Sequence, residues 1–284
     1  MLLALTLTKQ KVLNYYFNRR LKMNFKKGLA IGLAAFGLSL STQASEINVG
    51  GVVWDPDNTF QLFTDELTDF FAAGNLIETA TTGVGSTVTG VGKFARVNYG
   101  VNNEGDFCPG CDLTFEFSML TSAINPKLDM GGNPVLDPIS GLPLIDFEFS
   151  GLELNIYVDN AQNYVTGDVS TVTDGTLWLS LAARGLLIGT GTNIGTGSDT
   201  GTGVGSFDVT GGLAEGNFDT NTKVGGTDFT FSSSFQPILD GQGQPTGFLS
   251  GGFELSGNSI PEPASIALLG LGLLGFAASR KRKA

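Results

Sequence analysis

The two cysteines are the side chains of this sequence best suited to redox or metal chemistry. Cys108 and Cys111 are separated only by Pro109 and Gly110. In an exported protein such a pair is expected to form a small disulfide loop, here at the turn before a strand that starts at Asp112. A redox role would need a βαβ context and a helix N-terminus that lowers the thiol pKa, and neither is evident. Two thiolates without histidine also leave a zinc site short of its usual ligands.

Acidic residues near the start of the body indicate a second kind of chemistry, calcium binding. Asp55, Asp57 and Glu66 are spaced roughly as carboxylates are in a calcium-binding loop. The glycine that the EF-hand requires at its sixth position is replaced by Phe60. We therefore expect no cofactor, and an irregular calcium site at these three acidic residues remains the alternative.

Histidine is absent from the whole chain, which limits the hydrolytic chemistry available to it. Catalytic triads and dyads that depend on histidine are excluded. Glycoside hydrolysis needs only two carboxyl groups about 5–9.5 Å apart. The 27 acidic residues offer many pairs, and a sequence does not show their distances. No catalytic residue is assigned, and a carboxylate-based polysaccharide-degrading enzyme stays open as an alternative.

The N-terminal residues predict an export signal. Lysines precede an apolar run at 28–40, and small residues follow it up to Ala44. This order predicts a cleavable signal peptide that is cut between Ala44 and Ser45. The apolar run is shorter than the roughly 20 residues that a membrane span needs. Residues 1–44 are therefore interpreted as an N-terminal extension and signal peptide, with Met23 as the expected start.

The C-terminal residues 258–284 predict a second targeting segment. Pro261, Glu262 and Pro263 precede an apolar stretch, which we expect to form a transmembrane helix. The stretch is slightly short for the ~30 Å hydrocarbon core but spans it with snorkelling flanks. By the positive-inside rule its basic tail stays cytoplasmic, so the body faces outward. The tail consists of Arg280, Lys281, Arg282 and Lys283.

These C-terminal features resemble a known sorting signal. The Pro-Glu-Pro at 261–263, the short glycine-containing apolar stretch and the basic cluster are similar to the PEP-CTERM signal. The resemblance implies recognition by an exosortase, an inner-membrane protease of exopolysaccharide-producing Gram-negative bacteria, with cleavage near Pro-Glu-Pro. It further implies association with a biofilm or floc matrix. It says little about the body, because proteins with this signal carry unrelated bodies.

The body, residues 45–257, is strongly acidic. All 27 acidic residues lie between Glu46 and Glu262, an interval that holds only five of the 16 basic residues. The net charge of the processed chain, residues 45–262, is therefore about twice the −11 of the whole chain. Such a charge repels nucleic acid and anionic lipid. We expect no nucleic-acid partner.

Apolar and polar residues alternate in many segments of the body, with turn residues between the segments. This pattern predicts an all-β fold, and it is clearest at 112–120. We predict a single antiparallel β-sandwich, jelly-roll-like, formed by residues 45–257 as one domain. Trp54 and Trp178 lie in strand-like runs and are expected in its core.

Four segments are predicted to depart from plain alternation. Residues 64–73 have a cap-like start and are expected to form a short helix. The Ser-Gly pair at 150–151 is expected to be the turn of a hairpin. The proline-rich residues 125–143 predict a long surface loop. The Gly/Thr-rich residues 189–205 predict a flexible loop or a long, poorly packed hairpin.

The signals at the two ends indicate the function better than the body does. We expect a non-enzymatic protein that leaves through the secretory translocon and is tethered to the inner membrane as a precursor. An exosortase would then process it, and it would reside at the cell surface or in the extracellular matrix, contributing to biofilm or exopolysaccharide association. The first alternative is a carbohydrate-binding module, with or without calcium.

Overall fold

The computed structural model describes residues 46–260, except for residues 58, 62–66, 99–102, 195 and 197. The predicted signal-peptide cleavage site at Ala44 and Ser45 lies outside the described residues. So does the predicted transmembrane helix with its basic tail. Within the described part, no helix is long and apolar enough to cross a membrane.

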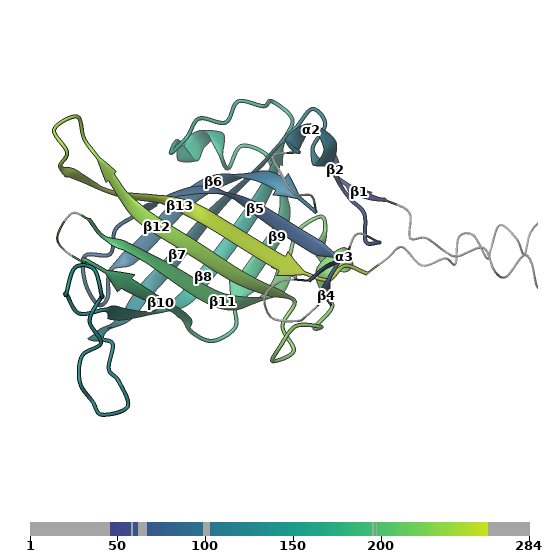
Figure 1. Cartoon of the computed structure of the whole chain (residues 1–284). Coiled ribbons are helices and arrows are strands. Elements are labelled where there is room, and N and C mark those ends of the chain that lie inside the picture. The colour runs from purple at the N-terminus through teal and green to yellow at the C-terminus, as the bar shows by residue number, and fades with distance from the viewer. Residues whose placement is uncertain are drawn as a thin grey trace, which may run out of the picture. The chain divides into compact units, whose positions relative to one another are not determined.

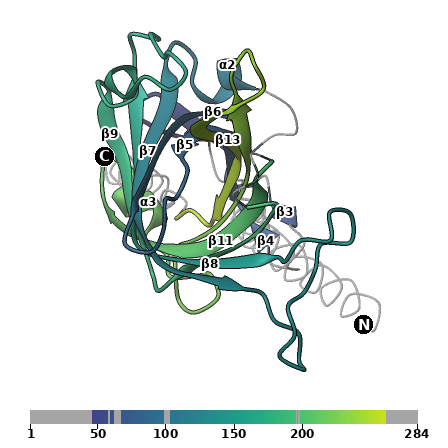
Figure 2. The same cartoon turned by 90° about the vertical axis from the view of Figure 1, so that its left-hand side faces the viewer.

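Nine antiparallel strands form one sheet that closes on itself (Figures 1 and 2). Their order is β10-β11-β12-β13-β5-β6-β7-β8-β9, and the pairs β8–β10 and β9–β11 join the two ends. Because β9 and β10 pair with the same two neighbours, the nine strands occupy eight positions around the ring. The strands are β5 (Phe70–Thr79), β6 (Thr87–Val97), β7 (Asp112–Pro126), β8 (Ile145–Asp159), β9 (Thr176–Ala183), β10 (Leu187–Thr192), β11 (Thr200–Gly211), β12 (Phe229–Leu239) and β13 (Pro245–Gly257).

The prediction of an all-β antiparallel fold is confirmed, and the structure makes it more definite. Strands that follow one another in the chain are neighbours in the sheet, except β9 and β10, which both lie between β8 and β11, and β13 returns to pair with β5. The two layers expected of a sandwich are therefore opposite walls of one closed sheet. An up-and-down strand order takes the place of jelly-roll crossovers. Closure removes the free edges that a sandwich would keep.

Smaller elements surround the closed sheet. Two short antiparallel pairs precede it, β1 with β2 and β3 with β4. In Figure 1, β1, β4 and α3 lie at the end of the sheet where β13 finishes. The bounds are β1 (Ile47–Val49), β2 (Val52–Trp54), β3 (Phe60–Gln61), β4 (Leu67–Thr68), α2 (Glu104–Phe107), η1 (Val169–Thr171) and α3 (Glu215–Phe218).

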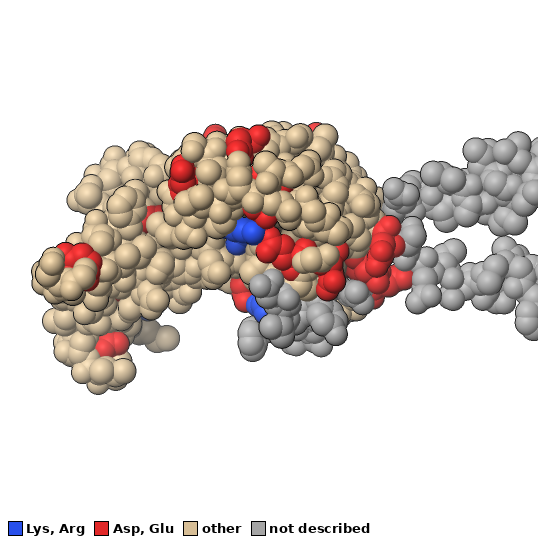
Figure 3. Space-filling view, turned by 90° about the horizontal axis from the view of Figure 1, so that it is seen from above, with Lys and Arg blue, Asp and Glu red and all other residues tan. Residues whose placement is uncertain are grey.

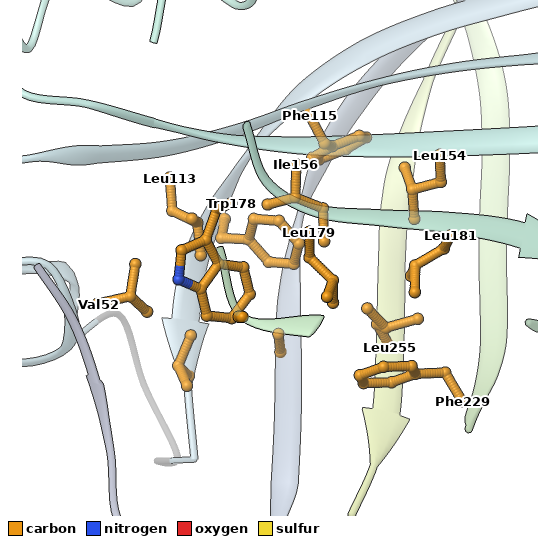
Figure 4. Packing of buried hydrophobic residues seen from close by; sticks show 14 of the residues in the cluster. Val52, Leu113, Phe115, Leu154, Ile156, Trp178, Leu179, Leu181, Phe229 and Leu255 are labelled. Carbon is orange, nitrogen blue, oxygen red and sulfur yellow. The ribbon is translucent and has the colours of Figure 1, made fainter. Parts of the chain in front are cut away.

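Aromatic side chains fill this end, which we call the packed end. Trp54 and Trp178 are buried there, as predicted. The Trp54 ring stacks on Phe218 with centroids 5.0 Å apart, and Phe70 approaches both rings edge-on. Trp178 Nε1 donates a 2.9 Å hydrogen bond to the carbonyl oxygen of Val49 and so ties the β1–β2 hairpin to the core. Figure 4 shows further side chains that meet in this interior, among them Leu113, Leu154, Ile156, Leu179, Phe229 and Leu255.

Phenylalanine and glycine face each other repeatedly across neighbouring strands. Between β6 and β7, Gly90 is paired with Phe117 and Gly92 with Phe115. A Cβ on either glycine would overlap the ring of its partner. Glycine is a poor strand residue on its own, and here it makes the space that a ring needs inside the closed sheet. The same pairing joins Gly74 to Phe253, Gly189 to Phe147, Gly201 to Phe235, Gly205 to Phe231 and Gly257 to Phe229.

The helix expected at 64–73 is wrong for the residues that the structure describes. Residues 67–68 form β4, and β5 starts at Phe70. Ala72 and Ala73 pair with β13 on one side and with β6 on the other. Hydrogen bonding to two neighbouring strands outweighs the local helix signals, because propensity is a weak preference beside tertiary pairing.

The hairpin expected at 150–151 is also wrong. β8 runs unbroken through this point and pairs with β7 on both sides of it. The β7–β8 register shifts here, and Gly151 has a φ of +61°. The Ser-Gly pair therefore forms a bulge within one long strand, which is a common use of glycine at positive φ.

The two other irregular segments agree with their predictions. Residues 127–144 form a projecting loop that two isolated β-bridges stiffen, Leu128–Pro134 and Leu136–Pro143 (Figure 1). Residues 189–205 lie mostly in the β10–β11 hairpin, the second of the two forms expected for them.

Candidate functional site

A cavity lies inside the closed sheet at the end opposite the packed end. Its volume is about 210 Å³, and residues from every strand of the sheet except β9 line it. We call it the inner cavity. Most of its wall is apolar, and the apolar side chains are Ala80, Val88, Met119, Phe147, Phe149, Leu187, Ile194, Phe235 and Leu249.

Small residues at inward positions keep the inner cavity open. Gly189 on β10 and Gly203 on β11 line it without a side chain, and Ser233 on β12 adds only a hydroxyl. A Cβ on Gly203 would meet Ser233 Oγ at 3.2 Å and Leu187 Cδ2 at 3.5 Å. Further along β11, toward the packed end, the inward position is filled by Phe207. The glycines of the Gly/Thr-rich segment 189–205 thus leave space for the cavity along one wall of the closed sheet.

Glu78 is the carboxyl group of β5 that faces the inner cavity. Its cross-strand partners are Gly90 on β6 and Leu249 on β13, neither of which carries a charge. Among the described residues, the Glu78 side chain makes no hydrogen bond or ion pair. Burial raises the pKa of Glu78 to about 7. The sequence analysis missed this residue, because it expected no strand at 70–79, where β5 places Glu78 on the inward face.

A second concave surface lies on the outer face of the same sheet. It has a volume of about 830 Å³, and no charged residue of the described chain lines it. Its polar side chains form two neighbouring rows that cross β10 to β13 and β5. We call it the outer groove. The rows are Thr190, Thr202, Ser234 and Asn75, and beside them Thr192, Thr200, Gln236 and Ser250.

The predicted cysteine pair directly follows α2 and belongs to the hydrophobic core. The structure joins Cys108 and Cys111 in a disulfide, with Cα atoms 5.1 Å apart and both residues buried. Next to it, Lys93 Nζ is 2.9 Å from the buried carboxylate of Asp112. Burial opposes the charge of Lys93, but hydrogen bonds and attraction from Glu104 and Asp112 prevail and raise the pKa of Lys93. This cluster fixes α2 against β6 and β7.

Of the candidate calcium ligands, the structure describes Asp55 and Asp57. Asp55 Oδ1 accepts a 2.9 Å hydrogen bond from the backbone of Asp57, so its carboxylate holds a turn. Glu66 lies outside the described residues. Nowhere in the described ranges do three His, Cys, Asp or Glu side chains converge as a metal would require.

The C-terminal end of the body is fixed as far as Ile260. Ser259 donates its N–H to Asp69 Oδ1 at 2.6 Å, and Asp69 donates its own N–H to Asn258 Oδ1 at 3.2 Å. The N–H of Ile260 bonds the carbonyl oxygen of Asn217 in α3 at 2.7 Å. Residues 258–260, which the sequence analysis assigned to the sorting segment, therefore pack on the body. The predicted sorting residues Pro261 to Pro263 and Arg280 to Lys283 lie outside the described residues.

Comparison with known proteins identifies this C-terminal segment. Residues 259–283 match the family model of the PEP-CTERM protein-sorting motif. The motif marks the chain as exported, with a membrane-anchored precursor and an exosortase as processing partner. It does not characterise the body. Neither the curated proteins nor the solved structures contain a match to this chain.

Proposed function

We propose that this protein is a non-enzymatic component of the cell surface or extracellular matrix, which an exosortase processes and which binds extracellular polysaccharide. The sorting motif at 259–283 carries the proposal. The motif begins where the hydrogen-bonded body ends, at residues 258–260. Cleavage near Pro261 would therefore leave every strand of the closed sheet paired.

The outer groove supports binding to a neutral polysaccharide. Hydroxyl and amide side chains line it in rows, and such groups exchange hydrogen bonds with sugar hydroxyls as they do with water. Among the described residues that line the groove there is no Asp or Glu, the side chains that cleave glycosidic bonds. This composition favours binding over hydrolysis at that surface.

The charge of the body supports the same partner class. Acidic side chains appear in separate groups on the face drawn in Figure 3, with only small basic patches among them. Anionic polymers would be repelled by such a surface. A neutral polysaccharide held in an uncharged groove avoids this repulsion.

The processing part of the proposal is tested by the intact mass of the protein recovered from its host, measured separately in cells and medium. The expected form begins at Ser45, ends near Glu262 and is found outside the cells. A form that retains Arg280 to Lys283 in every fraction would contradict exosortase processing.

The binding part is tested by co-sedimentation of the purified protein with the insoluble exopolysaccharide of the host. We expect the double variant Thr202→Glu/Ser234→Glu to lose at least tenfold in bound fraction, because both exposed positions lie in the outer groove. Thr87→Glu, at an exposed position on β6 outside the groove, is the matched control. Equal binding by the wild type, the double variant and Thr87→Glu would show that the outer groove does not bind the polysaccharide. Release of sugar fragments during the incubation would show that the protein is an enzyme and contradict a purely binding role.

A further inference from the structure

We propose that the inner cavity binds a small apolar amine, whose ammonium group pairs with the carboxylate of Glu78. The inner cavity and the outer groove lie mainly on opposite faces of the sheet, because inward and outward residues alternate along a strand, and they share Thr202 and Phe235 in their linings. The proposed site depends neither on the sorting motif nor on polysaccharide binding.

The shape of the inner cavity limits the size of its ligand. Its volume of about 210 Å³ lies below the ~300–1,000 Å³ usual for drug-sized ligands. Most of the cavity wall is apolar, from Val88 on β6 to Phe235 on β12. A compact aromatic or branched aliphatic body fits the apolar part of such a space.

The charge of the lining selects a cation. Glu78 and Asp199 are the titratable groups among the described lining residues, and neither Lys nor Arg is present. On the two neighbouring strands, the residues paired with Glu78 are Gly90 and Leu249, and neither can form an ion pair with its carboxylate. An anionic ligand would meet two like charges, and an ammonium group would supply the partner that Glu78 lacks in the described protein.

Aromatic rings add to this selectivity. Phe147 and Phe149 are stacked with centroids 6.1 Å apart on one wall, and Phe235 lies on another. The faces of such rings attract an ammonium group as well as the apolar body that carries it. The raised pKa of Glu78 agrees with the proposal, because an acid buried without a cation is only partly ionised near neutral pH.

Three probes with one skeleton and different charge test the proposal by calorimetric titration at pH 8. They are phenethylamine, phenethyl alcohol and phenylacetate, added to the protein as purified from its host without truncation. We expect phenethylamine to bind at least tenfold more tightly than the alcohol, and phenylacetate not to bind. Equal affinity for the amine and the alcohol would overturn the charge argument, and binding of none of the three would overturn the site.

Variants locate the binding. Glu78→Gln should weaken phenethylamine at least tenfold and leave the alcohol unchanged. Glu153→Gln removes an exposed carboxylate from the outer side of β8 and should change neither. Gly203→Val should weaken both probes, because it places a branched side chain in the cavity. Unchanged amine affinity in Glu78→Gln would refute the pairing.

The pH dependence of wild-type binding serves as a second measurement that needs no variant. Affinity for phenethylamine should fall at least fivefold between pH 8 and pH 5.5, as Glu78 becomes protonated while the amine stays charged. Affinity for phenethyl alcohol should not fall. A flat profile for the amine would contradict the proposal even if a variant failed to fold.

Discussion

Phe117 lies directly across from Gly90 in the β6–β7 pair, and its ring occupies the space that a Cβ on Gly90 would need. The relationship links the two residue types that are most conspicuous in the composition, 41 glycines and 21 phenylalanines. Neither residue would suit this position without the other. A closed sheet has limited room inside, and at these positions the small partner on the adjacent strand leaves space for the ring.

Gly90→Ala should therefore destabilise the protein by about 1–3 kcal/mol, because the added methyl group displaces the Phe117 ring. Urea unfolding of the variant and the wild type measures the change. Gly211→Ala is the matched control, since a Cβ there meets no atom within 4 Å. If both alanine variants had the same free energy of unfolding, the packing of Phe117 against Gly90 would not contribute to stability.

Lys93→Met should cost about 1–3 kcal/mol, because it leaves the buried carboxylate of Asp112 without its cation. The comparison variant is Lys127→Met. Lys127 pairs with Asp146 at 3.5 Å between side chains that are 41% and 43% exposed, and such pairs contribute under ~1 kcal/mol. Thermal and urea unfolding at neutral pH measure both effects, and a larger loss in Lys127→Met would contradict the ranking.

Glu78 should make the folded protein less stable as pH rises. Burial raises the pKa of Glu78 from its usual 4.5 to about 7, so the folded state binds more protons between these values than the unfolded state does. The free energy of unfolding should fall by about 2–3 kcal/mol from pH 4.5 to pH 7 on account of this residue and stay level above. Urea unfolding of Glu78→Gln at pH 5 and pH 8, without ligand, should lack this decline.

The matched control for the pH experiment is Glu153→Gln, which changes the same charge on the outer face. It should follow the wild-type decline between pH 5 and pH 8. Parallel behaviour of wild type and Glu78→Gln would mean that the carboxyl group of Glu78 is well solvated.

Replacing Pro261, Glu262 and Pro263 together by alanine should abolish release of the protein into the medium. The sorting motif would lose its defining residues while the body, which ends at Ile260, stays intact. Immunoblots of cell and medium fractions measure the distribution. Glu254→Ala, an exposed change on β13 upstream of the motif, should leave it unaltered. Normal release of the alanine triple variant would show that the motif is not used.

The sequence predicted what depends on local alternation. Residues 112–120 were expected as a strand, and β7 contains them all. It did not predict β5 or the bulge at Gly151, because strand pairing with distant residues decides both. β5 pairs with β13, at the far end of the body, and no local pattern reveals that contact. The inner cavity exists only because this pair closes the sheet, so neither the cavity nor the inward position of Glu78 was foreseen.

Both ends of the body belong to the same end of the closed sheet. β1 packs on Trp178 through Val49, and Ile260 bonds to α3 beside Trp54. The residues that line the inner cavity lie at the other end. Both ends of the described body are therefore distant from the inner cavity. If the inner cavity binds the amine proposed above, its binding would not depend on whether the C-terminal segment has been cleaved.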